Sequence, residues 1–299
     1  MPRPWSDYTL REWLRIRPFE QRYNYARYQF VARRVARIPA ARGDLPGLRA
    51  AMQGRQVLIA VAFNDADFVD WQTALVARNV PGCFHLIIDN SSDAGIAARI
   101  EAIAAARGCG YVKLAPNPWR KPIDGGRAHG SAMTWTWRNL LRPGRPAAFG
   151  FIDHDLFPLQ PTDPFAPLAH HPVAGQVRDK AGGKRWFLWA GYCFFRFDAV
   201  QSLPLDFSLD WNAGLDTGGA NWFVLYQRLA ADQVFDVGEV LEPIGDDVPL
   251  GVARFERLGD WLHFSNFSTP YNLPEAERAA LARRKRAILV TRIAAALAA

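Results

Sequence analysis

The sequence predicts an α/β fold in which a mostly parallel sheet has helices on both faces and further helices flank it at the two chain ends. Three observations lead to this prediction. Between residues 55 and 155, four apolar segments alternate with three segments of helical periodicity. Polar residues follow the apolar segments, and both ends of the chain are rich in helix-forming and basic residues. Such alternation is typical of βαβ units, whose parallel strands are covered by the connecting helices.

The expected elements can be placed in chain order. Strands are predicted at RQVLIAVAFND with its apolar run Val57 to Phe63, at CFHLIID, at YVKLAPNP and at AAFGFIDHD. Helices are predicted between them, at the apolar spacing of Phe68, Trp71, Leu75 and Val76, at AGIAARIEAIAAARG with Gly108 closing it, and at HGSAMTWTWRNLL. Farther on, RWFLWAGYCFFRFDAV predicts a buried strand through Gly191, and Asp216 or Thr217 is expected to cap a helix from Gly219 to about Leu229.

The two ends carry the basic charge of this 299-residue chain, whose net charge is +7. From Met1 to Arg42 ten arginines stand against three acidic residues, and from Pro274 onward six basic residues stand against two glutamates. At the N-terminus, Ser6 or Asp7 is expected to cap a first helix, and Pro18 to break or kink it. We therefore divide the chain into an N-terminal basic helical extension (1–50), a central domain (51–273, with halves 51–160 and 161–273) and a C-terminal basic helix (274–299).

Two interpretations of the basic ends stay open. They can pack on the domain with a solvated basic face, or they can contact an anionic membrane surface or glycan. No base-reading motif supports nucleic acid as a partner. Because neither a signal peptide nor an apolar run of bilayer length is seen, we expect a cytoplasmic protein, in the second interpretation peripheral at the inner membrane face. The three cysteines, Cys83, Cys109 and Cys193, are best explained by packing.

Polar residues follow the predicted strands at the edge where parallel sheets bind ligands. These residues are Asn64, Asp65, Asp89, Asn90, Asp153 and Asp155. A dinucleotide site of Rossmann type would need a glycine-rich turn where the chain has AFNDAD, and a phosphate-binding P-loop is also absent. Carboxylates repel phosphate unless a cation lies between them. An edge rich in carboxylates therefore predicts a Mn²⁺ or Mg²⁺ site that neutralises a diphosphate.

The segments VLIAVAFNDADFVDWQTAL, HLIIDNSSDAG and HGSAMTWTWRNL, the last running into FGFIDHDLFP, resemble the nucleotide-binding half of the GT-A glycosyltransferases, especially the family 2-like group. The resemblance covers residues 55 to 158 and continues more loosely to about residue 269. It implies a GT-A type sheet and a metal-dependent glycosyltransferase of hexosyltransferase type. Such an enzyme moves a sugar, with inversion, from a nucleoside-diphosphate sugar to a hydroxyl of a glycan or lipid-linked acceptor.

The resemblance also implies roles for individual residues. Asp89 lies where the family holds the nucleobase, with Phe63 and Asn64 beside it; the alternative is that Asp89 caps a turn or the following helix. Asp153 and Asp155 form a DxD motif, in which Asp153 faces the ribose or the metal and Asp155 binds the metal. In an extended chain both carboxylates point to one side while His154 turns away; the alternative is a surface turn with unused aspartates.

Two further candidates lie later in the chain. Asp216 stands where family members place the catalytic base, although DTGG replaces the usual Glu-Asp pair and a helix cap is the alternative. His263, in WLHFSNFS, resembles the histidine that completes the metal shell, and a buried core histidine is the alternative. His129 can also approach the donor.

Two rival functions stay open as well. A sugar nucleotidyltransferase should carry a glycine-rich basic loop after the first strand, where the chain has AFNDAD. A non-catalytic module on the same fold would bind a glycan or a membrane surface without metal or nucleotide.

Overall fold

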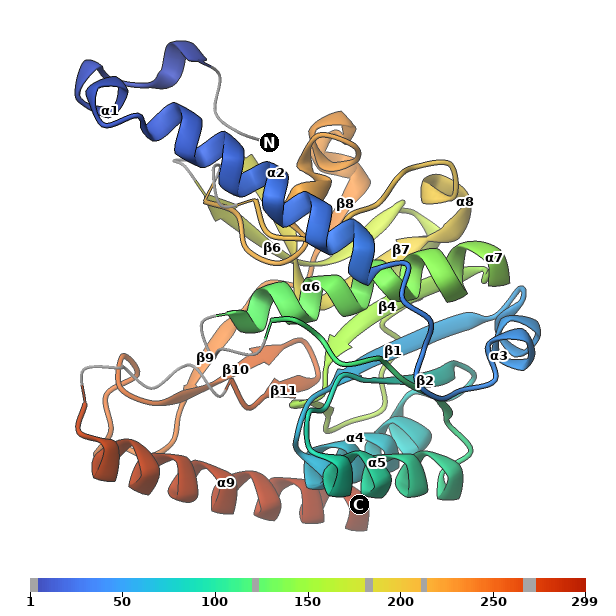
Figure 1. Cartoon of the computed structure of the whole chain (residues 1–299). Helices are drawn as coiled ribbons and strands as arrows, with labels where there is room; N and C mark the ends of the chain where they lie inside the picture. The colour runs from blue at the N-terminus through green and yellow to red at the C-terminus, as the bar shows by residue number, and fades with distance from the viewer. Residues whose placement is uncertain (1–4, 120–123, 181–184, 211–213, 266–272) are drawn as a thin grey trace.

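A computed structural model describes residues 5–119, 124–180, 185–210, 214–265 and 273–299, and a seven-stranded sheet lies at its centre (Figure 1). The strand order is β3-β2-β1-β4-β7-β6-β8. The strands are β1 (Gln56–Ala62), β2 (Phe84–Asp89), β3 (Gly110–Lys113), β4 (Ala148–Asp153), β6 (Val173–Lys180), β7 (Arg185–Arg196) and β8 (Val234–Asp236). All of them run in one direction except β7, which is antiparallel to both of its neighbours. The predicted mostly parallel α/β sheet is therefore confirmed.

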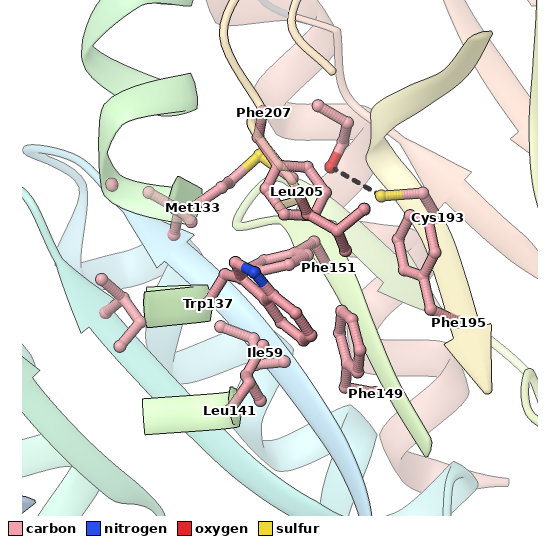
Figure 2. Packing of buried hydrophobic residues seen from close by; sticks show 14 of the residues in the cluster. Ile59, Met133, Trp137, Leu141, Phe149, Phe151, Cys193, Phe195, Leu205 and Phe207 are labelled. Carbon is pink, nitrogen blue, oxygen red and sulfur yellow. Dashed lines mark hydrogen bonds between the residues drawn. The ribbon is translucent and has the colours of Figure 1, made fainter. Parts of the chain in front are cut away.

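Helices cover both faces of this sheet. Successive side chains of a strand point to opposite faces, and here the side chains on both faces are apolar and need cover. In β1, Leu58 and Ala60 pack under α4 (Ala66–Asn79) and α5 (Ala94–Ala106). Val57 and Ile59 point to the other face, under α3 (Leu45–Met52), α6 (Gly125–Thr136), the π-helical turn η3 (Trp137–Leu141) and α7 (Arg142–Gly144). Figure 2 shows this second core, in which Trp137 lies over Ile59 and Phe149. The strongly apolar strands thus follow from a sheet buried on both sides.

A second, four-stranded antiparallel sheet begins directly after β4. Its order is β5-β11-β10-β9. The strands are β5 (Leu156–Pro158), β9 (Val240–Pro243), β10 (Arg254–Leu258) and β11 (Trp261–His263). The C-terminal helix α9 (Glu275–Ala298) packs against this sheet and α4 through Leu289 and Ile293. Since β5 follows β4 along the chain and pairs with β11, residue 263 is brought to the end of β4.

The remaining helices are short, apart from one at the N-terminus. They are η1 (Trp5–Asp7), α1 (Leu10–Leu14), α2 (Arg17–Val35), η4 (Ala166–Ala169), α8 (Phe197–Val200), η6 (Gly219–Trp222), η7 (Tyr226–Arg228) and η8 (Ala231–Gln233). Within the described residues, no helix is both long and apolar enough to cross a membrane.

Two local predictions were wrong. The cap of α1 is Thr9, not Ser6 or Asp7, because Thr9 and Glu12 form a reciprocal capping box. Pro18, as predicted, separates two helices, and it does so from the first turn of α2.

The helix predicted from Gly219 to about Leu229 is also wrong, because the chain forms two separate short turns there, η6 and η7. Gly218, at φ 90°, precedes η6 in a left-handed conformation, and no side chain caps that turn. The division into domains stays a prediction: its boundary at residue 50 falls within α3, and the seven-stranded sheet extends across residue 160.

Candidate functional site

A tight turn at the end of β4 presents the two carboxylates of the DxD motif. Asp153 is the last residue of β4, and Leu156 begins β5, so His154 and Asp155 form the turn. The buried amide of Gln72, from α4, donates hydrogen bonds to the carbonyl oxygens of Asp153 and Leu156, both at 2.7 Å. The turn is therefore held at both ends by one buried side chain.

The turn brings Asp153 and Asp155 together with His263. Nε2 of His263 lies 3.3 Å from Oδ1 of Asp155 and 3.9 Å from Oδ2 of Asp153. One ligand atom from each of the three residues can be chosen so that all lie within 4.8 Å of one another. The predicted convergence of the carboxylates is thus present, but a turn rather than an extended strand produces it. The ring of His154 lies 6.0 Å from that of Phe68.

Glu256 orients His263 from the neighbouring strand. The two residues are directly paired in the register of β10 and β11, and Nδ1 of His263 lies 2.8 Å from Oε2 of Glu256. Burial by itself would lower the pKa of His263, but the carboxylates of Asp155, Glu256 and Asp153 outweigh it and hold that pKa above its usual value. Because an ionised Glu256 can only accept, the Nδ1 proton faces it, and Nε2 is left toward the two aspartates.

This donor set fits a divalent cation of the Mn²⁺ or Mg²⁺ type. Two carboxylates and one imidazole nitrogen are suitable ligands, and a carboxylate behind the ligating histidine is the usual way to fix its tautomer. Asp155 is buried, and its pKa is held well below the usual range because His263 outweighs the effect of burial. The carboxylate is therefore ionised, as metal binding requires.

His129 and Gly191 also lie next to Asp153. Nδ1 of His129, from α6, lies 3.4 Å from Oδ1 of Asp153. A Cβ atom at Gly191 would lie only 2.7 Å from Oδ2 of Asp153 and would also collide with the ring of Trp189. Glycine at residue 191 thus leaves room for the carboxylate of Asp153, which explains why a glycine interrupts this buried strand.

An aromatic and basic wall continues from His263. The rings of Trp189 and His263 lie 4.7 Å apart, and the guanidinium of Arg178 lies 4.6 Å above the ring of Trp189. Arg178 also approaches Glu256, at 4.0 Å. A half-exposed cation therefore stands beside the carboxylate cluster, where an anionic group of a substrate can meet it.

The predicted nucleotide residues divide into an internal and an exposed group. Asp89 is completely buried; its carboxylate accepts hydrogen bonds from the backbone N–H of Ser91 at 2.8 Å and from the hydroxyl of Tyr111 at 2.8 Å. These contacts favour the alternative in which Asp89 caps a turn. Asn64 joins the ends of β1 and β2 through hydrogen bonds with Ser92, whereas the ring of Phe63 is 49% exposed.

Other carboxylates of the sheet edge are engaged elsewhere. Asp65 caps α4 and, with Asp67, forms ion pairs with Arg286 of α9. Of the carboxylates predicted at this edge of the sheet, only Asp153 and Asp155, which surround His263, therefore remain available for a ligand.

Asp216 is exposed and lies beside the start of α6. Its Oδ1 accepts from the backbone N–H of Thr217 at 2.7 Å, and the Thr217 hydroxyl donates to the carbonyl of Gly126 at 3.2 Å. Gly126 is one helical turn before His129, which contacts Asp153. The predicted base is thus on the same side of the sheet as the cluster, and its helix-capping alternative is wrong.

Sequence reasoning missed Glu256, Gln72 and Arg178. Gln72 is a polar residue on the apolar face of its helix, which is a weak signal that a buried partner exists, whereas Glu256 lies in the charged stretch RFERL and gives no such signal. No signal in the sequence relates Arg178 to Trp189. Residues 266–268, the end of the HFSNFS segment, lie outside the described residues.

Comparisons with known proteins add a structural likeness only. No family model and no curated protein matches the chain. A glucosyl-3-phosphoglycerate synthase from Mycobacterium tuberculosis, in complex with Mn²⁺, uridine diphosphate and glucosyl-3-phosphoglycerate, is similar with 17% identity and a TM-score of 0.43, over 84% of each chain. A mannosyltransferase from Pyrobaculum calidifontis, in complex with GDP-Man and Mn²⁺, is similar with 14% identity and a TM-score of 0.35, over 59% of this chain and 53% of that one. Because the sequence identities and TM-scores are low, the function of this chain has to be argued from its own side chains.

Proposed function

We propose that the protein is a metal-dependent glycosyltransferase that moves a sugar from a nucleoside-diphosphate sugar to an acceptor hydroxyl, with inversion. The observation that carries this proposal is the convergence of Asp153, Asp155 and His263 at the carboxyl edge of a parallel sheet, with Nε2 of His263 3.3 Å from Asp155. Parallel α/β sheets bind their ligands at this edge. The GT-A resemblance of the sequence gives the cluster its chemical role, and the acceptor class, a glycan or a lipid-linked hydroxyl, comes from the same resemblance.

Each residue of the cluster has a distinct task in this proposal. Asp155 and His263 hold Mn²⁺ or Mg²⁺, and Asp153 holds either the metal or the ribose. A bound divalent cation would supply the positive charge that stabilises a departing diphosphate. Glu256 keeps the Nδ1 proton of His263 in place, and Gln72 fixes the turn. Arg178 adds a cation beside the cluster, and the exposed ring of Phe63 offers a surface on which a nucleobase can stack.

Asp216 is proposed as the base that takes the proton of the acceptor hydroxyl. Its carboxylate is exposed and accepts hydrogen bonds only from the neighbouring Thr217 among the described residues. One oxygen thus stays open to a substrate. A base in such a position contributes about 10² to 10⁴ in rate.

The test combines calorimetry with a screen of donors. Binding of UDP and GDP is titrated with and without Mn²⁺, and nucleotide sugars are screened for metal-dependent hydrolysis or transfer. We expect Asp155→Asn to abolish metal-dependent nucleotide binding and also to lower the melting temperature, because it removes one partner of the buried pair with His263; circular dichroism checks that the variant is folded. Asp198→Asn is the matched control and should behave as wild type, because Asp198 is an exposed carboxylate of α8 that pairs with Arg196 at the end of β7.

Two results would contradict the proposal. Glycan binding that needs neither metal nor nucleotide assigns the fold to a non-catalytic module. Release of diphosphate from a nucleoside triphosphate and a sugar phosphate assigns it to a sugar nucleotidyltransferase. The cytoplasmic location stays a prediction from the sequence.

A further inference from the structure

The structure distinguishes between the two basic ends of the chain. At the C-terminus, three of the six basic residues of α9 form ion pairs: Arg284 pairs with Asp247, Arg286 with Asp65 and Asp67, and Arg292 with Glu242. Lys285 is buried and donates to the carbonyl of Ser265. For these four residues of α9 the packing interpretation is therefore sufficient.

The N-terminal end differs in both charge and exposure. Residues 5–38, called the arm below, carry eight arginines and three acidic residues. In the part of the chain that the structure describes, Arg27, Arg33 and Arg34 are exposed and form no ion pair. The positive charge of this part of the arm is thus directed to the surroundings.

Large apolar side chains of the arm are also exposed. Of the fifteen exposed large hydrophobic side chains in the described residues, eight belong to the arm, although it is a small part of the chain. Leu10 is 77% exposed, Leu14 78% and Ile16 60%. The rings of Trp5, Trp13 and Phe19 cluster with centroids 5.5 to 6.1 Å apart and still remain accessible. Such a concentration of apolar surface marks an interaction site.

The apolar stripe of α2 lies on the face turned away from the domain. Pro18, Tyr28 and Ala32 are its buried residues. Phe19, Tyr23 and Phe30, spaced by four and seven residues, share one face and are each 58% or more exposed. Arg27 and Arg34 fall beside this stripe in the helical repeat. A helix that packs on its domain with one face and shows aromatics and arginines on the other is built to meet a second surface.

We propose that the arm binds the surface of an anionic phospholipid bilayer. Arginine, tryptophan and leucine side chains together suit the headgroup boundary, where charge meets anionic lipid and the rings and aliphatic groups enter the acyl region. Figure 1 shows α1 and the first turns of α2 extending beyond the sheets, so this part of the arm protrudes from the domain.

Binding at the arm would hold the catalytic edge near the membrane. The ring of Tyr28 in α2 lies 5.4 Å from that of Trp119, in the segment before α6, and Arg127 of α6 lies above both rings. The same helix α6 carries His129 to Asp153. An acceptor embedded in the bilayer would thus reach the site from the side of α6.

The test is cosedimentation of the full chain with vesicles of phosphatidylcholine alone and with added phosphatidylglycerol. Wild-type protein should bind only the anionic vesicles and dissociate as salt is added. Arg33→Gln with Arg34→Gln should lower the partition coefficient at least about tenfold, since each basic residue near such a surface contributes roughly fivefold. Leu10→Ser with Leu14→Ser should lower it as well, and both double variants should keep the wild-type melting temperature because the side chains are exposed.

Arg283→Gln with Arg284→Gln removes the same charge from α9 and is the matched control, expected to change partitioning less than about twofold. Equal loss in this control, or no binding of wild type to anionic vesicles, would overturn the proposal. Concentration-dependent dimerisation that is lost in Leu10→Ser with Leu14→Ser would overturn it too and assign the arm to a second copy of the chain. None of these outcomes depends on the glycosyltransferase activity.

Discussion

Replacement of Glu256 tests whether His263 acts as a metal ligand held in one orientation. Glu256 lies 2.8 Å from Nδ1 of His263, and its side chain is only 8% exposed. A hydrogen bond of this kind, between charged groups and away from water, contributes about 1.5 to 3 kcal/mol. Loss of such a partner behind a ligating histidine lowers metal affinity by about 10- to 100-fold, which corresponds to about 1.4 to 2.7 kcal/mol.

We expect Glu256→Ala to weaken Mn²⁺ binding within that range and Glu256→Gln to weaken it less, because the amide oxygen still accepts the Nδ1 proton. Calorimetric titration of Mn²⁺ measures the affinity, and thermal unfolding without metal separates it from stability. Glu242→Gln is the matched control: Glu242 lies in the same small sheet and pairs with Arg257 and Arg292, so its loss should lower stability and leave Mn²⁺ affinity unchanged.

Wild-type Mn²⁺ affinity in a folded Glu256→Ala protein would refute this reasoning if Asp155→Asn abolishes binding. Glu256 would then not position a metal ligand, and His263→Ala would be needed to decide whether His263 binds the metal at all. A loss of affinity in Glu242→Gln equal to that in Glu256→Ala would also refute it, since the effect would then be one of overall stability.

Three further predictions concern other parts of the molecule. Asp216→Asn should leave donor and metal binding intact but slow sugar transfer at least about a hundredfold, and near-normal turnover would reject the base role. Gly191→Ala should lower Mn²⁺ affinity at least about tenfold in the same titration, because the added methyl group displaces Asp153. In the control Gly251→Ala the added methyl group has no atom within 4 Å, so the affinity should not change. Equal affinities in the two variants would contradict this reasoning. Burial lowers the pKa of His85 from 6.5 to about 4, so the unfolded state takes up its proton first and stability falls as the pH drops through this window. The unfolding free energy measured in urea should fall by about 3 kcal/mol less in His85→Leu than in wild type as the pH drops from about 6.5 to about 4. An equal fall in both proteins would contradict the role of His85.

Local patterns were sufficient to predict β1 to β4 and β7 of the central sheet, but not β6 and β8. The apolar run in β1 reflects the burial of this strand on both faces. Gly108, which closes α5, has the left-handed conformation that favours glycine, at φ 66°. Both features can be recognised in a short stretch of sequence. The predicted helix at residues 219–229 failed because Gly218 is left-handed, at φ 90°, and its N–H donates to the carbonyl of Phe207, a contact that the sequence pattern does not show. The N-terminal cap was missed because three neighbouring residues can all cap and only Thr9 completes the reciprocal bond with Glu12.

The candidate site was only partly predictable for a related reason. The sequence by itself determined that Asp153 and Asp155 end a buried strand, since polarity changes abruptly there, and it marked His263 as a candidate. Only the tertiary structure decided which carboxylates remain for a ligand. In the folded chain Asp89 is buried and hydrogen-bonded to Tyr111, and Asp65 forms an ion pair with Arg286, 221 positions away. The pairing of β10 and β11 places Glu256 next to His263. Ion pairs and strand registers between distant segments depend on how the chain packs as a whole, and for that reason no local pattern encodes them.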